Sequence, residues 1–309
     1  MNFLFIFLDG VGLGPDNPLS NPLAKAKLPN LMSLFDREKL VTETLLKNGN
    51  PITYKAATLI GLDANLGVKG HPQSATGQAS ILTGINVSEK LGIHFGPWPN
   101  EEIRNMLKEF SIFTELKQRG YTSTLLNAYP QTYFERIKTG RRIPGAIAMS
   151  AMEAGIKLKT TEDLIAGKAL SADFTGHGWQ NNLNLPDIPT ISLQSAGIRL
   201  AKLSREYNFA FFEYWISDYA GHRGDMDEAC TLLENFDTVI GSLLSSWLPS
   251  DGLIFITSDH GNLEDTNTRG HTRNLVPGIV IGPEHLRTYF TETLNDLTDI
   301  APSILKLYS

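Results

Sequence analysis

The run FLFIFL occupies residues 3–8 and ends at Asp9, where a glycine-rich turn begins. A short, continuous apolar run is typical of a strand that is covered on both faces in a parallel sheet. Similar runs occur at residues 209–212, 253–256 and 278–281. We therefore predict that these four segments are strands of one mostly parallel sheet.

Helical periodicity alternates with these apolar runs, at residues 189–206, 225–247 and 298–308. Strands that alternate with helices favour an α/β fold, in which helices flank the sheet. Residues 89–195 differ, because they combine a helical segment and a short strand with a basic, aromatic stretch. We expect this part to be a smaller α/β cap domain, inserted into a core made of residues 1–88 and 196–309.

The composition limits the classes of function. The chain has 33 acidic and 27 basic residues and a net charge of -6, which argues against a dedicated nucleic-acid surface. No apolar stretch approaches the roughly 20 residues that span a bilayer, and no basic residues precede the first run as in a signal peptide. The single cysteine, Cys230, fits a reducing compartment. We expect a cytoplasmic protein that binds neither nucleic acid nor membrane, in an oligomeric state that the sequence leaves open.

Acidic and histidine side chains follow three of the predicted strands, those at residues 3–8, 209–212 and 253–256. One further histidine lies in the loop after the strand at 253–256. The carboxyl ends of parallel strands share one edge of a sheet, so these side chains are expected to converge. Carboxylate oxygens and imidazole nitrogens suit Zn or Mn, and two ions about 3.5–4 Å apart commonly serve displacement at phosphorus. The six residues are Asp9, Asp218, His222, Asp259, His260 and His271.

A hydroxyl-rich segment, QSATGQASILTG at residues 73–84, predicts a loop that leads into a helix. A Ser or Thr at that position has two interpretations. It caps the helix, which is the commoner role, or it is a nucleophile beside a metal, where helix N–H groups face a phosphate.

Taken together, the motifs resemble the alkaline phosphatase superfamily, in particular the metalloenzyme branch that contains cofactor-independent phosphoglycerate mutase and phosphopentomutase. Their order matches that family over both core segments. The resemblance implies an alkaline-phosphatase-like core. The motifs are LDGVG at 8–12, the segment 74–84, SDYAGH at 217–222, TSDHGN at 257–262 and GHT at 270–272.

The resemblance also implies two divalent metal ions, Mn or Zn, and a ligand set for each. One ion would be bound by Asp9, Asp259, His260 and the Ser74 hydroxyl, and the other by Asp218, His222 and His271. Ser74 would be the nucleophile, since it stands four residues before Gln78, where the mutases carry His. Sulfatase activity is disfavoured, because Thr76 and Gln78 stand where sulfatases carry Pro and Arg.

We therefore expect phosphoryl transfer through a phosphoserine at Ser74, with a small phosphorylated metabolite as substrate. Hydrolysis of a phosphomonoester is the first interpretation, because the middle segment is much smaller than the insert of bacterial-type phosphoglycerate mutase. An intramolecular phosphomutase is the alternative. A metal-binding module without catalysis is an alternative of another class, and the intact Ser74 argues against it. Dinucleotide binding is disfavoured, since no helix follows the glycines at 10–14.

The basic stretch of the middle segment contains candidate substrate-binding residues. Arg136, Arg141 and Arg142 could face the active site and bind an anionic substrate. The alternative is a solvated helix end, which is the commoner role of any single residue in such a run.

Overall fold

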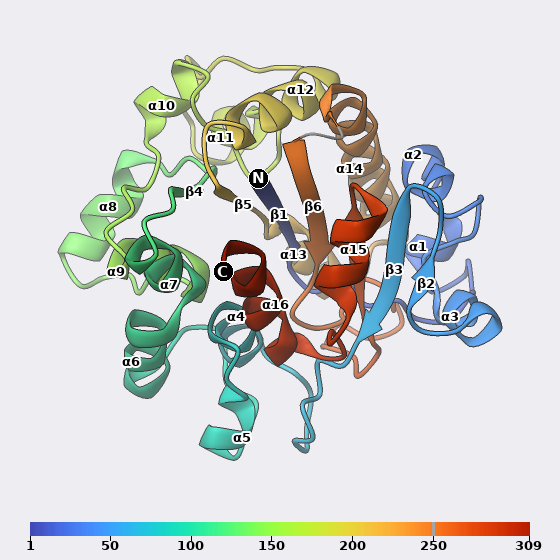
Figure 1. Ribbon diagram of the computed structural model, residues 1–309. Helices are drawn as coiled ribbons and strands as arrows, with labels where there is room; N and C mark the ends of the chain where they lie inside the picture. Colours follow the sequence, from blue (N-terminus) through green and yellow to red (C-terminus); the bar gives the residue numbers. More distant parts are fainter. Residues whose placement is uncertain (249–250) are drawn as a thin grey trace.

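The computed structural model describes residues 1–248 and 251–309 and has one sheet at its centre, with strand order β2-β3-β7-β6-β1-β5-β4 (Figure 1). Strands β4, β5, β1, β6 and β3 point one way, and β7 and β2 oppose them. The prediction of a mostly parallel α/β fold is confirmed. The strands are β1 (Asn2–Leu8), β2 (Ile52–Thr53), β3 (Ala57–Leu62), β4 (Ser123–Leu125), β5 (Phe209–Tyr214), β6 (Gly252–Thr257) and β7 (Val276–Ile281).

Helices connect the strands and cover both faces of the sheet (Figure 1). None of the helices in the described part of the chain is both long and apolar enough to cross a bilayer. The α-helices are α1 (Pro22–Lys25), α2 (Pro29–Ser33), α3 (Thr42–Asn48), α4 (Ser74–Thr83), α5 (Val87–Leu91), α6 (Glu101–Phe110), α7 (Ile112–Gln118), α8 (Gln131–Lys138), α9 (Ala146–Glu153), α10 (Thr161–Ile165), α11 (His177–Asn182), α12 (Leu193–Ser204), α13 (Ile216–Arg223), α14 (Met226–Ser246), α15 (Glu284–Thr291) and α16 (Ile300–Leu305).

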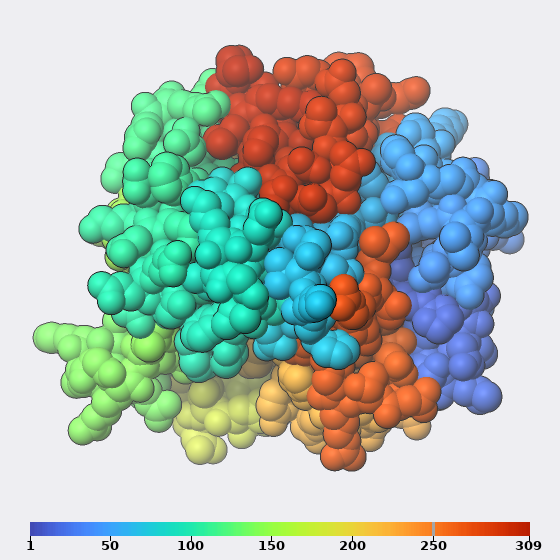
Figure 2. All heavy atoms as spheres, turned by 90° about the horizontal axis from the view of Figure 1, so that it is seen from below, coloured from blue at the N-terminus to red at the C-terminus, as the bar shows by residue number. Residues whose placement is uncertain are grey.

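The first apolar run forms the middle of the sheet, and its side chains alternate between two cores. Phe3, Phe5 and Phe7 face the core covered by α4, α6, α7, α9 and α16. Leu4 and Ile6 face the core covered by α1, α2, α12 and α14. All five side chains are buried, and each contributes roughly 1.5–3 kcal/mol to the free energy of unfolding. Figure 2 shows the C-terminal residues beside those of α4 to α7, over the first core.

The predicted strands and the structure differ in the direction of β7. This strand lies antiparallel to β6, because parallel neighbours need a crossover connection, usually through a helix. Residues 258–275, between the two strands, contain no helix and carry candidate metal ligands instead. The helical segment expected within residues 89–195 is divided into α6 and α7 at Ser111. The Ser111 side chain accepts a hydrogen bond from Thr114 N and so caps the start of α7.

The segment expected to form a cap, residues 89–195, lies partly in the main body. Its strand β4 pairs with β5 in the central sheet, and α6, α7 and α9 share a core with the phenylalanines of β1. A small separate cluster includes Leu164 of α10 and Trp179 of α11, while α8 and α10 lie at the outer edge (Figure 1). The division into a core and an inserted domain stays a prediction.

Candidate metal centre

The carboxyl ends of three adjacent strands, β6, β1 and β5, bring the candidate ligands together. Asp9 directly follows β1, and Asp259 comes two residues after the end of β6. Asp218 lies in the first turn of α13, which begins just after β5. His271 comes from the loop before β7, which Figure 2 shows in orange beside the blue segment near residue 70.

The first group of side chains surrounds the His260 ring. Its Nε2 atom lies 3.5 Å from Asp9 Oδ1 and 3.6 Å from Asp259 Oδ2. The Ser74 hydroxyl lies 3.1 Å from the same nitrogen. One imidazole nitrogen, two carboxylates and one hydroxyl therefore share a space small enough for a single divalent ion.

The second group adjoins the first and is centred on Asp218. Its Oδ2 atom lies 3.3 Å from His222 Nε2, and its Oδ1 atom lies 3.7 Å from His271 Nε2. The His271 ring stacks on the His260 ring at a centroid distance of 3.7 Å. Asp218, His260 and His271 are also close enough to share an ion, so His260 lies at the boundary between the two groups.

The three candidate ligand histidines share one hydrogen-bonding pattern. Nδ1 donates to a backbone carbonyl, that of Arg269 for His222, of Gly261 for His260 and of Pro72 for His271, at 2.7, 3.3 and 2.6 Å respectively. With the proton on Nδ1, the lone pair on Nε2 is directed at the carboxylates. Hydrogen bonding of the second ring nitrogen is the usual way in which proteins orient a metal-ligating histidine.

Burial makes this cluster unfavourable without a cation. Burial raises the pKa of Asp9 well above its usual range, and the negative charges of Asp259 and Asp218 raise it further. Burial also raises the pKa of Asp259, and burial together with His271 lowers the pKa of His260. Asp9 Oδ1 and Asp259 Oδ2 are buried without a hydrogen-bond partner. Unpartnered buried oxygens facing neutral imidazoles fit a divalent metal ion.

Ser74 does not cap its helix. It is the first residue of α4, the cap position is Gln73, and no side chain there accepts a capping bond. By contrast, the Thr76 hydroxyl is engaged, since it donates to Gln73 O at 3.1 Å and accepts from Phe95 N at 3.2 Å. The geometry thus leaves the hydroxyl of Ser74, and not that of Thr76, directed at the metal-type residues.

Gln78 lies one helical turn after Ser74 and is buried. Its Nε2 atom donates to Asp9 Oδ2 at 3.4 Å. A neutral amide donor therefore contacts the carboxylate oxygen that His260 does not approach. This contact orients Asp9 without adding charge to the centre.

Glu264 is an acid for which the sequence left two roles open, a solvated side chain or one that orients metal ligands. Its buried carboxylate accepts from Gly12 N at 2.9 Å and Asn262 N at 2.8 Å, and also from the hydroxyl of Thr272 and the amide of Asn274. These donors belong to the three segments that carry Asp9, His260 and His271. The only sequence signal was its position close to a ligand motif, where acidic residues are commonly solvated.

A cavity of about 420 Å³ opens over the metal-type residues, within the usual range for ligand pockets. Arg142 lines this cavity, as do Ser74 and Gln78. Arg136 and Arg141 line a neighbouring cavity of about 400 Å³ that shares Arg142 and Trp98 with the first. Of the three predicted substrate-binding arginines, the structure therefore brings one into the site itself.

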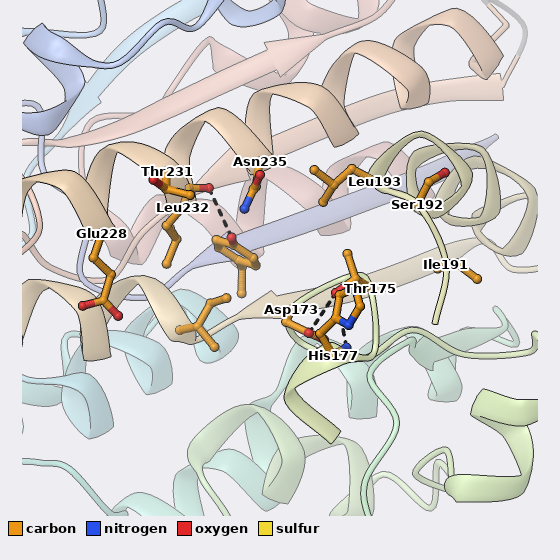
Figure 3. Close-up of a pocket in the computed structure, with 12 residues that line it drawn as sticks. Asp173, Thr175, His177, Ile191, Ser192, Leu193, Glu228, Thr231, Leu232 and Asn235 are labelled. Carbon is orange, nitrogen blue, oxygen red and sulfur yellow. Dashed lines mark hydrogen bonds between the residues drawn. The ribbon is translucent and has the colours of Figure 1, made fainter. Parts of the chain in front are cut away.

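A third cavity, of about 640 Å³, lies between α14, α12 and the loop before α11 (Figure 3). It has two carboxylates: Glu228 pairs with Arg223 at 3.1 Å, and Asp173 accepts from Thr175 Oγ1 at 3.0 Å and Gly178 N at 2.8 Å. The single histidine of this cavity, His177, belongs to neither metal-type group. Nothing in this cavity resembles a catalytic arrangement, despite its larger size.

Comparison of the sequence with known proteins supports the metal-centre interpretation. Residues 191–309 match the family model described as Metalloenzyme superfamily. A 2,3-bisphosphoglycerate-independent phosphoglycerate mutase from Thiobacillus denitrificans is 33% identical over 111 residues, 34% of this chain and 21% of that protein. The corresponding protein from Clostridium novyi is 36% identical over 110 residues, 33% of this chain and 21% of that one. The match therefore spans about a fifth of the length of these relatives.

Solved structures resemble the whole chain. The PH0037 protein from Pyrococcus horikoshii has a TM-score of 0.57 at 17% identity, covering 99% of this chain and 96% of that one. The alkaline phosphatase from the Antarctic bacterium TAB5 has a TM-score of 0.51 at 16% identity, covering 99% and 97%. Likeness at this identity shows the fold. The match to the Metalloenzyme superfamily model is confined to residues 191–309, a segment that is also similar to part of the 2,3-bisphosphoglycerate-independent phosphoglycerate mutases.

Proposed function

We propose that this protein is a two-metal phosphoryl-transfer enzyme that acts through a phosphoserine at Ser74 and hydrolyses small phosphomonoesters. One observation carries the proposal. An uncapped hydroxyl at the first position of α4 lies 3.1 Å from His260 Nε2, beside buried carboxylate oxygens that lack partners. No packing requirement explains this arrangement, whereas a nucleophile beside metal ions requires it.

The donor set suits two divalent ions, and we propose Mn or Zn in both positions. Asp9, Asp259, His260 and Ser74 would hold one ion, and Asp218, His222 and His271 the other. Bound there, the ions would lower the pKa of the Ser74 hydroxyl and stabilise negative charge on the transferring phosphoryl group. The carbonyls of Pro72 and Arg269 contribute by fixing the His271 and His222 rings.

The chain's own groups account for the remaining steps. Ser74 Oγ attacks phosphorus, the bond from phosphorus to the ester oxygen breaks, and the leaving alcohol takes up a proton. The bond from phosphorus to Ser74 Oγ then breaks as water takes the phosphoryl group, which regenerates the serine hydroxyl and releases inorganic phosphate. Because α4 begins at Ser74, the positive end of its dipole lies where phosphoryl charge accumulates.

A phosphomutase is the second candidate, because the curated relatives with matching segments are named as phosphoglycerate mutases. In that case a second hydroxyl of the retained substrate, and not water, takes the phosphoryl group from Ser74. The two reactions share the metal centre and differ in what the cavity over Ser74 retains. A small phosphorylated metabolite is the proposed substrate in both cases, and the free Cys230 supports a cytoplasmic location.

The test supplies the purified protein separately with Mn, Zn and Mg, and then with p-nitrophenyl phosphate, sugar phosphates and 3-phosphoglycerate. Inorganic phosphate is measured colorimetrically, and isomerised esters by phosphorus NMR. Release of phosphate without an isomerised ester supports the phosphatase, and the reverse result supports the mutase. Neither product from any ester with any metal, from protein shown to bind the metal, would contradict both.

A further inference from the structure

The cavity over Ser74 has a second half that contains no metal-type residue of either group. Arg142, Trp98, Tyr129 and Tyr133 line it, together with one acid, Glu213. Glu213 is the penultimate residue of β5, five residues before Asp218. It is near enough to raise the pKa values of Asp9 on one side and of Tyr129 and Tyr133 on the other. The acid is therefore close both to the metal centre and to the aromatic residues that line the cavity.

The Glu213 carboxyl lacks the partners that a structural acid would have. Among the described residues, no cation lies within ion-pair distance of it and no protein group donates a hydrogen bond to it with normal geometry. Tyr129, beside it, has a buried hydroxyl without a hydrogen-bond partner of normal geometry. Burial raises the pKa of Glu213 to about 7, although Arg142 and Tyr129 lower it in part. A half-buried acid at a cavity wall, without a cation beside it, has capacity to accept hydrogen bonds from a ligand.

Arg142, which lines the same cavity as Glu213, is held by aromatic rings. Its guanidinium lies 4.8 Å from the centre of the Tyr133 ring and 5.7 Å from that of Trp98. Stacking of this kind fixes the planar head and leaves its N–H donors available at the edges. No carboxylate pairs with Arg142 in the described part of the chain. The cavity thus presents donors from Arg142 and an acceptor from Glu213.

Large aromatic side chains are also exposed around the opening of the cavity. Trp98, Trp215 and Tyr219 are 46%, 48% and 60% exposed, and all three line this cavity. Exposed aromatic groups that gather at one place mark a binding surface rather than chance exposure. Their flat apolar faces suit a ligand that is itself flat or ring-shaped.

Given the proposed phosphoryl transfer at Ser74, we infer that Glu213 and Arg142 recognise the leaving group, and that this group is a polyhydroxylated ring, as in a sugar phosphate. A hydroxyl both donates and accepts, so neighbouring ring hydroxyls satisfy Glu213 and Arg142 together. The C–H faces of the ring pack on Trp98 and Trp215. The opposite charges of Glu213 and Arg142 favour a neutral leaving group, and Glu213 disfavours one that carries a carboxylate. Glu213 is thus a residue that determines specificity.

The experiment compares ribose 5-phosphate and glucose 6-phosphate with 3-phosphoglycerate and p-nitrophenyl phosphate, in the wild type and two variants. Glu213→Gln removes the charge, and Glu213→Leu removes the acceptor at similar size. Glu206→Gln is the matched control, since Glu206 is exposed and lies before the opposite end of β5. Thermal unfolding checks that each variant is folded. Isothermal titration of the Ser74→Ala variant, with and without Glu213→Leu, measures binding of ribose 5-phosphate and 3-phosphoglycerate in the absence of turnover.

We expect the wild type to prefer a sugar phosphate, and Glu213→Leu to lower kcat/KM for it by roughly ten- to a hundredfold, the effect of losing hydrogen bonds to a charged group. Hydrolysis of p-nitrophenyl phosphate should stay within about twofold, and Glu206→Gln should match the wild type. Equal losses for sugar and nitrophenyl esters would overturn the inference, as would a preference for 3-phosphoglycerate. If no ester is hydrolysed, the proposed function fails, and the titration alone decides whether Glu213 binds sugar phosphates.

Discussion

The Nε2 atoms of His222 and His271 face each other at 3.3 Å, while the Nδ1 atom of each ring bonds a backbone carbonyl. Two nitrogen lone pairs at this distance repel unless a cation or a proton lies between them. Asp218, with a carboxylate oxygen close to each nitrogen, supplies the negative charge that such a cation needs. The arrangement of the two rings therefore fits the proposed metal site.

The two metal positions should respond differently to loss of a ligand. We expect His222→Ala to lower the occupancy of one ion and Asp9→Ala that of the other, since each removes a ligand from one group. Metal content measured by plasma mass spectrometry after dialysis checks this, with His285→Ala, outside both groups, as the control. Equal loss of both ions in both variants would show that the assignment of ligands to two separate sites is wrong.

Replacement of Glu264 should loosen the centre without removing a ligand. Glu264→Gln keeps the size of the side chain, and its oxygen can still accept from Gly12 N and Asn262 N, but its NH₂ group then replaces the acceptor of the Thr272 hydroxyl and the Asn274 amide. We expect metal affinity to fall by about ten- to a hundredfold, as is usual when the groups that orient ligands are changed. Competition with a chelator measures this affinity. An affinity equal to that of the wild type would mean that the three ligand segments hold their positions without Glu264.

The arginines of the basic stretch should differ in their importance. We expect Arg142→Ala to lower kcat/KM for the preferred substrate by about tenfold, because Arg142 lines the cavity over Ser74. Arg141→Ala is the matched comparison, since Arg141 lines only the neighbouring cavity, and its effect should be smaller. Steady-state kinetics with the substrate and with p-nitrophenyl phosphate separates binding of the leaving group from chemistry. A larger effect of Arg141→Ala would indicate that the substrate binds in the neighbouring cavity.

The stability of the metal-free protein should depend on pH through Glu213. Burial raises the pKa of this carboxyl from 4.5 to about 7 in the folded state, so the folded protein binds the extra proton. The contribution of this protonation to the free energy of unfolding is fully present below about pH 4.5. It is lost as the pH rises through 7, and the loss is at most about 3 kcal/mol. Between pH 5 and 8, the wild type should therefore lose stability relative to Glu213→Gln in urea unfolding. Parallel curves for the two proteins would show that Glu213 has an ordinary pKa.

The sequence predicted four of the strands and the convergence of the candidate ligands at the carboxyl ends of three of them, because both depend on local patterns. The apolar run at residues 3–8 and the acids after the strands needed no distant partner to be recognised. The strand β3 (Ala57–Leu62) was missed, since its place depends on antiparallel pairing with β7, more than 200 residues away. The sequence left open whether Glu264 is solvated or orients the ligands, and it gave no signal for Glu213. The local sequence around an acidic residue does not show whether its side chain is solvated or buried. Burial depends on how distant segments pack around it.

The phosphoserine at Ser74 is the central claim, and trapping it tests the claim most directly. The metal-loaded protein is mixed briefly with substrate, quenched in acid and analysed by peptide mass spectrometry. We predict one phosphate on Ser74 in the wild type. We predict none in Ser74→Ala, with turnover reduced by roughly three orders of magnitude or more and the metals still bound. Ser33→Ala, an exposed serine outside the site, should behave as the wild type. Phosphate on Thr76, or full activity of Ser74→Ala, would contradict the account.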